Sequence, residues 1–204
     1  MKRAFLFVVA MVVGPLAAAD TPDTCPAPHT GRYINYDHYY AFTVPAGYSG
    51  TWQSPCAWDQ ELSDCICIGS HGLYISLSAM AAINVFSFYP DTEENTTAQI
   101  LKSAVTFQRD AALKMAGSIT RPQSISVNGT KGVRLVLKWR DTKSKVAMKK
   151  VTYLLVTTSN DKQDPKAELV LSLIAPEAEF VDRQQLFDKM LKTFSWQPPW
   201  PPSK

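Results

Sequence analysis

The chain has 204 residues, of which 46% are hydrophobic and 19% are charged, and its formal net charge is +3. A charge this small excludes partners selected by charge alone, such as nucleic acid or a membrane surface. The length suits one domain whose core is large enough to need neither metals nor many crosslinks.

The N-terminus has the pattern of an export signal. Lys2 and Arg3 precede an apolar run over 4–16, and three alanines followed by Asp20 form a cleavage site. The run is shorter than the roughly 20 residues that span a bilayer. We therefore expect a signal peptide over 1–19 and no transmembrane segment. The mature chain, 20–204, would carry a charge of +1 once Lys2 and Arg3 are removed. It would be periplasmic in a Gram-negative bacterium and secreted otherwise.

The front of the expected mature chain contains two strand patterns. A short strand is predicted around Arg32–Asn35, and a second over Tyr39–Val44, where Tyr40, Phe42 and Val44 fall on one face. A Pro-Ala-Gly sequence follows the second pattern, so we expect a turn there.

A long loop without periodicity follows, over Tyr48–Gly72, and most of the cysteines lie in it. Cys25, Cys56, Cys65 and Cys67 are the four cysteines of the chain, and export predicts that they form two disulfides. Four cysteines allow three pairings. A Cys65–Cys67 bridge would enclose one residue and be strained. Of the other two pairings we favour Cys56–Cys65 with Cys25–Cys67, so the front of the chain would be a disulfide-stapled loop.

Two strands and a helix are predicted next. Alternation favours strands over Leu73–Leu77 and Ile83–Tyr89. The helix can begin near Asp91 or at a second cap, Thr96, and Gly117 ends it. Its apolar positions, mostly at helical spacing, are Leu101, Ala104, Val105, Ala111, Ala112 and Met115.

The back half of the chain is strand-rich until a final helix. Strands are predicted over Ser124–Val127, 133–140, Lys145–Thr158 and Glu168–Ala175. Asn128-Gly129 is a hairpin signal, and the polar break over 159–165 makes an antiparallel meander the expected arrangement.

A second helix is predicted over Glu177–Thr193. The apolar side chains placed on its inner side are Val181, Phe187, Met190, Leu191 and Phe194. The stretch Trp196–Pro202 is too rich in proline for a helix or a strand, and 197–204 is expected to be a Pro-rich tail. Strand-rich blocks that are each followed by a helix predict an α+β fold, a twisted antiparallel sheet covered by two main helices.

Three segments resemble the PsbP-like α/β-sandwich superfamily of small exported domains. They are the opening "YDHYYAFTVPAG", the long helix after a block of strands, and the closing "FDKMLKTFSW". The resemblance covers roughly Tyr33–Trp196. It implies a scaffold used for binding or assembly, and no catalytic motif can be carried over from it. The four-cysteine loop departs from the family pattern.

The candidate binding surface lies in the stapled loop and the aromatic front. Its residues are Tyr48, Trp52, Trp58, Asp59, Glu61, Asp64 and His71. Aromatic rings beside polar groups are typical of sites that bind sugars or proteins. The leading prediction is a non-enzymatic exported domain, without a cofactor or a metal, that binds a protein or a component of the cell envelope.

Two alternatives place chemistry in the same loop. An envelope hydrolase would use His71 together with acidic residues of the loop. Asp59 and Asp64 could act as its paired carboxylates. A metal-binding protein would use His71 with three cysteines as a tetrahedral set, although the paired Cys-x2-Cys spacing is absent. His38 is expected to be a loop or strand-edge histidine without a catalytic role.

Asn95 and Asn128 each begin a glycosylation acceptor pattern. In a bacterial host these positions would mean only an exposed helix start and an exposed turn.

Overall fold

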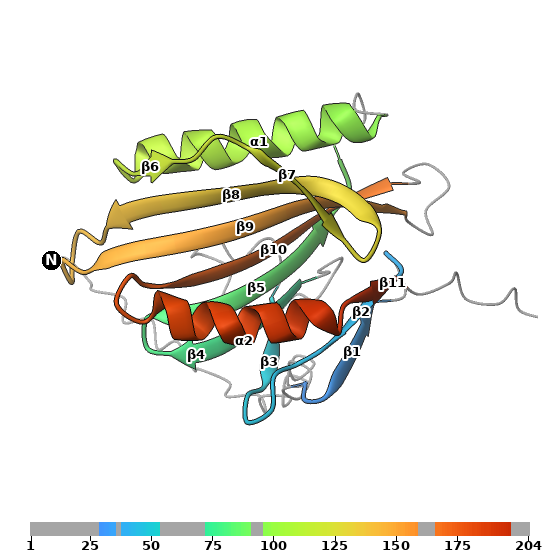
Figure 1. Ribbon diagram of the computed structural model, residues 1–204, viewed down its shortest axis with the longest axis horizontal. Coiled ribbons are helices and arrows are strands. Elements are labelled where there is room, and N and C mark those ends of the chain that lie inside the picture. The colour runs from blue at the N-terminus through green and yellow to red at the C-terminus, as the bar shows by residue number, and fades with distance from the viewer. Residues whose placement is uncertain (1–28, 36–37, 54–71, 91–95, 159–165, 197–204) are drawn as a thin grey trace, which may run out of the picture.

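A computed structural model of the chain describes residues 29–35, 38–53, 72–90, 96–158 and 166–196 (Figure 1). The strands of the first half are β1 (Arg32–Asn35), β2 (Tyr40–Thr43), β3 (Gly50–Gln53), β4 (Gly72–Ser78) and β5 (Ala81–Phe88). After helix α1 (Thr97–Lys114) come β6 (Ser118–Ile119), β7 (Gln123–Val127), β8 (Thr130–Arg140), β9 (Ala147–Thr158) and β10 (Lys166–Pro176). Helix α2 (Phe180–Lys192) and β11 (Ser195–Trp196) complete the described part of the chain.

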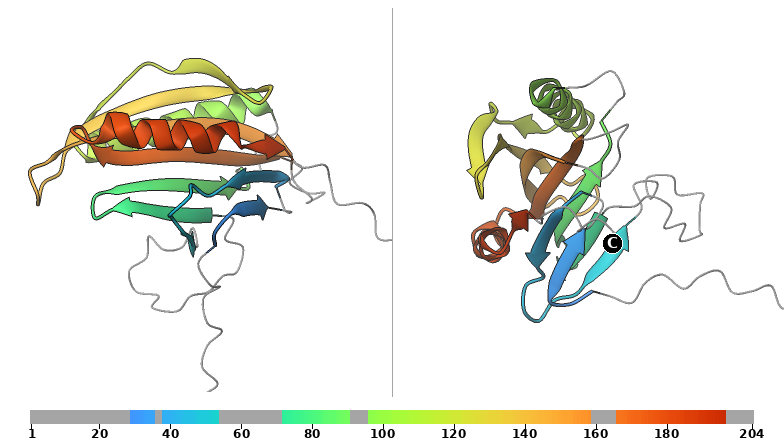
Figure 2. Two further views of the ribbon diagram at one scale, coloured as in Figure 1. Left: turned by 60° about the horizontal axis from the view of Figure 1, so that its bottom comes forward. Right: turned by 90° about the vertical axis from the view of Figure 1, so that its right-hand side faces the viewer.

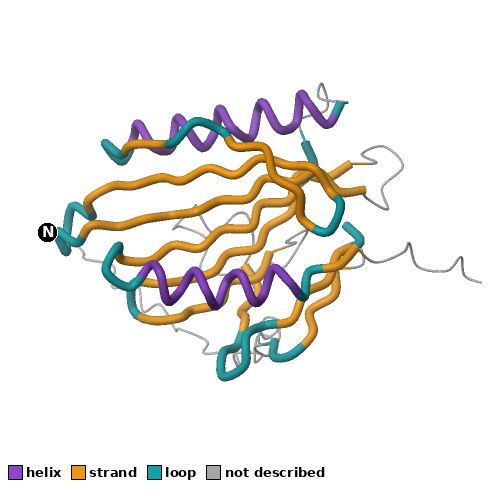
Figure 3. The backbone as a smooth tube through the Cα atoms, in the orientation of Figure 1, coloured by secondary structure: helices purple, strands orange, loops and turns teal. Residues whose placement is uncertain are grey.

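The strands form one large and one small antiparallel sheet (Figure 3). The large sheet has the order β3-β4-β5-β10-β9-β8-β6, with β7 also paired to β8. The small sheet has the order β1-β2-β11. The α+β class and the antiparallel sheet with two helices, both predicted from the sequence, are therefore confirmed. The cysteines of the predicted disulfides lie outside the described residues.

The predicted meander is the centre of the large sheet. Strand β9 pairs with β8 on one side and with β10 on the other, both antiparallel. Side chains alternate between the two faces of a strand, so Leu169 and Leu171 lie on one face of β10 and Val170 on the other. A helix covers each of the two faces of these strands, and part of each face is therefore apolar.

Helix α1 covers one face of the meander. It begins at the second of the two predicted starts, because the Thr96 hydroxyl accepts from the Gln99 backbone N–H at 3.2 Å and the Gln99 side chain accepts from the Thr96 N–H at 3.0 Å. The other start, near Asp91, lies outside the described residues. The buried face of the helix consists of Ile100, Ala104, Val105, Gln108 and Ala112.

Helix α2 lies on the opposite face of the sheet (Figure 2). Phe180, Phe187 and Met190 are its buried side chains and pack with the leucines of β10. Val181 was expected on this inner side, and that prediction is wrong, since the side chain is 69% exposed. The helix begins three residues later than predicted, and Phe180 occupies the buried position of the first turn. Val181 therefore points about 100° away from it.

Three short strands depart from the sequence prediction. Strand β3 lies within the predicted loop and pairs with β4. Strand β6 follows the predicted stop of α1 and pairs with β8. In β11, Trp196 pairs with Tyr40, although the sequence from Trp196 onward was judged too rich in proline for a strand. Strands of two to four residues are too short to show a period, so pairing with a longer partner decides them.

The predicted hairpin turn between β7 and β8 is confirmed. Asn128 and Gly129 have φ angles of 46° and 86°, the left-handed pair that a two-residue hairpin loop needs. The Asn128 side-chain amide also donates to the carbonyl oxygen of Phe194, which fixes the turn to the end of α2. In the described part of the chain, neither helix has the length and apolar character needed to cross a membrane.

Candidate functional site

Most residues of the surface predicted from the sequence lie outside the described residues. Trp58, Asp59, Glu61, Asp64 and His71 all fall within 54–71. Trp52 belongs to β3, where its backbone pairs with Leu73. The binding surface in this loop therefore stays a prediction, as do the hydrolase and the metal site, whose residues also lie there.

Tyr48 is the predicted surface residue that the structure describes most fully. Its ring is partly buried against the core, and its hydroxyl oxygen accepts from Arg183 Nη1 at 3.4 Å. Arg183 in turn donates to Glu179 Oε2 from Nε and Nη2, at 3.2 and 3.0 Å. Tyr48 thus connects the turn after β2 to α2. It also lines a hollow of about 490 Å³ formed by residues 30–31 and 43–49, which contribute no charged side chain.

A group of polar side chains is buried where the small sheet packs on the large one. We call it the buried polar cluster, and its members are Tyr33, Asn35, His38, Tyr40, Ser87 and Thr157. At its centre, Nδ1 of His38 lies 2.6 Å from Oγ of Ser87, and the Tyr40 hydroxyl lies 3.3 Å from the same Oγ. This places a hydroxyl and an imidazole within the distance needed for nucleophilic catalysis.

Further hydrogen bonds attach the cluster to the backbone. The His38 N–H donates to Asn35 Oδ1 at 2.7 Å, and the Thr157 hydroxyl donates to the His38 carbonyl oxygen at 2.7 Å. Asn35 Nδ2 also lies 3.5 Å from the hydroxyls of Tyr33 and Tyr40. The cluster therefore joins the β1–β2 hairpin to β5 and β9.

The cluster is closed to a substrate. His38 is 0% exposed and Ser87 is 2% exposed, so no carbonyl carbon can approach the Ser87 hydroxyl in this conformation. Desolvation, followed by the influence of Tyr33, raises the pKa of Tyr40 well above its usual value and keeps the phenol neutral. The hydrogen bonds of the cluster join the two sheets, so we assign the cluster to the specificity of sheet packing.

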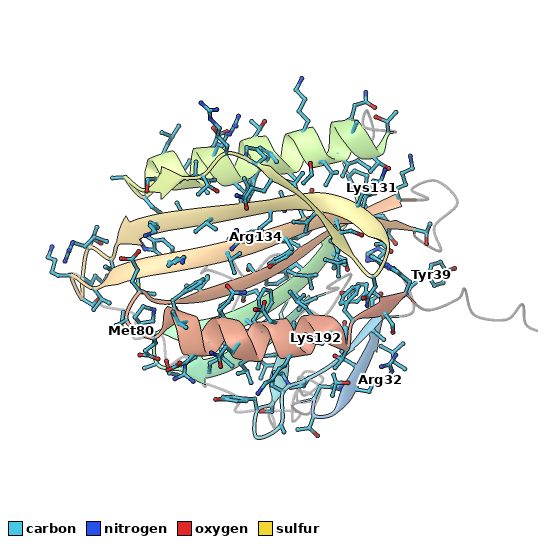
Figure 4. All side chains as sticks on the ribbon, viewed as in Figure 1. Arg32, Tyr39, Met80, Lys131, Arg134 and Lys192 are labelled. Atoms are coloured by element: carbon cyan, nitrogen blue, oxygen red, sulfur yellow. The ribbon has the colours of Figure 1, made fainter. Side chains whose placement is uncertain are left out.

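An open hollow lies on the other side of α2, between the helix and strands β8 and β9. We call it the α2 groove, and its volume is about 370 Å³. It is lined by Arg134, Lys149, Tyr153, Phe180, Val181, Gln184, Gln185 and Asp188. It exists because α2 packs mainly over β10 and leaves the same face of β8 and β9 partly uncovered. Figure 4 shows Arg134 on the strands beside the helix.

The floor of the groove combines cations with aromatic rings. Arg134 lies directly opposite Tyr153 in the β8–β9 register, and its Nη1 donates to Gln123 Oε1 at 3.1 Å. Lys149 Nζ lies 4.2 Å from the centre of the Phe180 ring, within the range of a cation–π contact. Arg134 thus has a neutral partner, whereas Lys149 also interacts with an acid, because its charge adds to that of Lys138 in lowering the pKa of Glu177.

Acidic side chains lie at the margins of the groove. Glu177 Oε1 is 2.6 Å from Nζ of Lys138, whose hydrogen bond and charge lower the pKa of Glu177. Asp188 Oδ1 accepts from Gln184 Nε2 at 2.8 Å. Oε1 of Gln184 is shielded from water and has no hydrogen-bond partner among the residues described. The groove therefore offers two cations, aromatic rings, an amide and the carboxylate of Asp188, and these groups suit binding better than bond cleavage.

No side chains of the described ranges gather as three or more His, Cys, Asp or Glu ligands of a metal. Sequence reasoning missed the α2 groove altogether. The signal that could have indicated it is the pair Arg134 and Lys149, which fall on the same face of their strands as buried valines. A charged residue at a strand position where the alternation predicts a buried side chain indicates that the covering helix leaves that position open to solvent.

No protein-family model matches the sequence, and no curated protein matches it. The fold is similar to the cyanobacterial PsbP of Synechocystis sp. PCC 6803, at 13% identity, over 90% of this chain and 99% of that one, with a TM-score of 0.43. It is also similar to PA94 of Pseudomonas aeruginosa, a protein of unknown function described as a putative regulator. That match has 12% identity, covers 82% of this chain and 99% of that one, and has a TM-score of 0.46.

A third similar structure is LpqN of Mycobacterium tuberculosis, a protein involved in cell envelope biogenesis. The identity is 10% over 84% of this chain and 86% of that one, with a TM-score of 0.40. The PsbP-like resemblance expected from the sequence is thus shown as a weak resemblance of fold, and these likenesses carry no argument about function.

Proposed function

We propose that this chain is an exported, non-enzymatic binding domain that recognises a protein or a cell-envelope component, and that the α2 groove is the site of binding. The observation that supports this most is the open groove with two cationic side chains and two aromatic rings on one face of the sheet. Arginine and tyrosine, both present in the groove, are enriched at the centres of protein interfaces. The predicted signal peptide over 1–19 supports an exported location.

The groove is also better suited to binding than the other polar region of the molecule. In the buried polar cluster the His38–Ser87 pair has the spacing of a catalytic dyad without access for a substrate. The α2 groove has the access and lacks a nucleophile paired with a base. Binding without turnover is the function that this division supports.

The test is photo-crosslinking in the native cells of the protein. A photoreactive amino acid replaces Val181, which lines the groove, and in a second variant it replaces Phe107, on α1. Each side chain is 69% exposed and each lies on a helix, so the two positions are matched in accessibility. We expect one discrete crosslinked species from position 181 and none from position 107. Equal products at both positions, or none at 181, would contradict the proposal.

The same cells test the expected export. Mass spectrometry of the purified chain should show a mature protein that begins at Asp20. A full-length chain that remains in the cytoplasm would contradict the exported location.

A further inference from the structure

We infer that the α2 groove binds an extended acidic peptide segment of a partner protein. This inference rests on the proposed function, and it names the chemistry of the partner. It follows from the spacing of the two cations, from the apolar surface between them and from their position below the rim of α2.

The spacing of the cations matches an extended chain. Arg134 is opposite Tyr153 in the sheet, and Tyr153 is four residues from Lys149 on the same face of β9. Four residues of a strand span about 13 Å, and side chains four positions apart point the same way. A peptide that runs along β9 would therefore place two acidic side chains, four positions apart, at Arg134 and Lys149.

The surface between the cations suits an apolar residue of the same peptide. Phe180 and Tyr153 contribute rings to the groove, and the exposed Val181 forms part of its helical wall. The residue midway between the two acids has its side chain on the same face as theirs, because the side-chain period of a strand is two. We expect that residue to be leucine or another apolar amino acid.

The charges favour a carboxylate-bearing peptide over an anionic membrane. Arg134 and Lys149 are half-buried beside a helix, whereas binding to a lipid surface needs basic side chains that protrude together. The guanidinium of Arg134 can instead hold one carboxylate with two parallel hydrogen bonds.

The experiment measures binding of synthetic peptides to the purified mature chain by fluorescence anisotropy. The first peptide carries two glutamates four positions apart with a leucine midway. The second has glutamines in place of the glutamates, and the third has its glutamates three positions apart, so that they point to opposite faces. We expect the first peptide to bind most tightly and its affinity to fall as salt is added.

Substitutions then assign the binding to the groove. Arg134→Gln and Lys149→Gln should each weaken the first peptide by about fivefold, as expected for a partly exposed ion pair. Lys114→Gln, in the exposed last turn of α1, is the control and should leave the affinity unchanged. Circular dichroism should show that all three variants are folded.

Three outcomes would overturn the inference. One is the absence of acidic-peptide binding while position 181 still crosslinks in cells, in which case the proposed function stands with a partner of other chemistry. Another is equal affinity for the peptides with spacings of four and three. In the last, no peptide binds, the chain binds phosphatidylglycerol vesicles, and Arg134→Gln abolishes that binding. This result would indicate a membrane partner. Loss of crosslinking at position 181 would instead remove the proposed function itself.

Discussion

The buried polar cluster and the α2 groove both contain polar side chains, but they differ in access to solvent. In the cluster, the Ser87 hydroxyl lies within hydrogen-bonding distance of both His38 and Tyr40, and all three residues have almost no exposure to water. In the groove, Arg134 contacts a glutamine and Lys149 an aromatic ring, and both cations line an open hollow. A buried polar network specifies how two sheets pack, whereas an exposed one can exchange its partners for a ligand. Access to solvent therefore makes the α2 groove, and not the buried polar cluster, the candidate for binding a ligand.

Removal of His38 should have the largest effect on stability. His38→Ala leaves a cavity and deprives Ser87 Oγ of its 2.6 Å contact, so we expect a loss of about 3 kcal/mol in the free energy of unfolding. Urea denaturation measures it. His29→Ala is the matched control, because the His29 bond to the Arg32 carbonyl oxygen is exposed, and it should cost less than about 1 kcal/mol. Similar losses in the two variants would contradict the structural role of the cluster.

Lys150 is a partly buried cation whose ammonium group contacts the neutral side chain of Gln108. Burial under α1, where Nζ reaches Gln108 Oε1 at 3.3 Å, lowers the pKa of Lys150 to about 8. In the unfolded chain the pKa is about 10.4, so the unfolded state binds more protons between these values and stability rises with pH there. Below pH 8 the folded protein bears the full cost of the buried charge.

Lys150→Met removes this cost. We expect the variant to be more stable at pH 7 by on the order of 2 kcal/mol, with the advantage disappearing between about pH 8 and 10.5. Urea titrations of both proteins across that pH range measure the difference between their free energies of unfolding. Groups that titrate in both proteins contribute equally and cancel in this difference. An advantage that stays constant with pH would show that the lysine is charged and well solvated in the folded state.

Thr157 tests one hydrogen bond of the cluster. Thr157→Val keeps the shape of the side chain and removes the donor to the His38 carbonyl oxygen, so we expect a loss of about 1–2 kcal/mol in stability. The neighbouring Thr158 is exposed, and Thr158→Val should change stability by less than about 0.5 kcal/mol. Thermal melts of the two variants make the comparison, and a smaller loss at 157 than at 158 would count against the account.

Groove variants should have the smallest effect on stability. Arg134→Gln and Lys149→Gln remove half-exposed charges whose partners are a glutamine and an aromatic ring, so each should change stability by less than about 0.5–1 kcal/mol. Denaturation under the same conditions as for His38→Ala tests this. A loss as large as that of His38→Ala would mean that the groove cations hold the fold together.

The sequence was informative where an element depends on residues that are close together in the chain. The alternation over 133–140 and the capping box at Thr96 predicted β8 and the start of α1, because each depends on neighbours within a few residues. The pairing of β11 with β2 joins Trp196 to Tyr40, and no local signal indicates such a contact. The position of Val181 was mispredicted because it lies six residues from Phe187, which places the two side chains about 120° apart around the helix.

The candidate site was harder to predict than the fold. The α2 groove forms from two strands and a helix, and its openness depends on α2 packing over β10 rather than β9, a choice made by the whole core. The surface predicted from Tyr48 and the loop residues rested on composition. Of these residues, Tyr48 has a described side chain, and it contacts Arg183 on α2. Buried hydrogen-bond partners such as His38 and Ser87 are 49 residues apart in the chain, which a search for short motifs cannot join.

The most direct test of the α2 groove as the binding site is crosslinking from position 181 in native cells. It is measured in three backgrounds: the unchanged chain, Arg134→Gln and Ser87→Ala. We expect the yield of the crosslinked species to fall with Arg134→Gln and to persist with Ser87→Ala, at a temperature where both variants are folded. Crosslinking that is insensitive to Arg134 and lost with Ser87 would place function in the buried polar cluster and contradict the assignment of the α2 groove as the binding site.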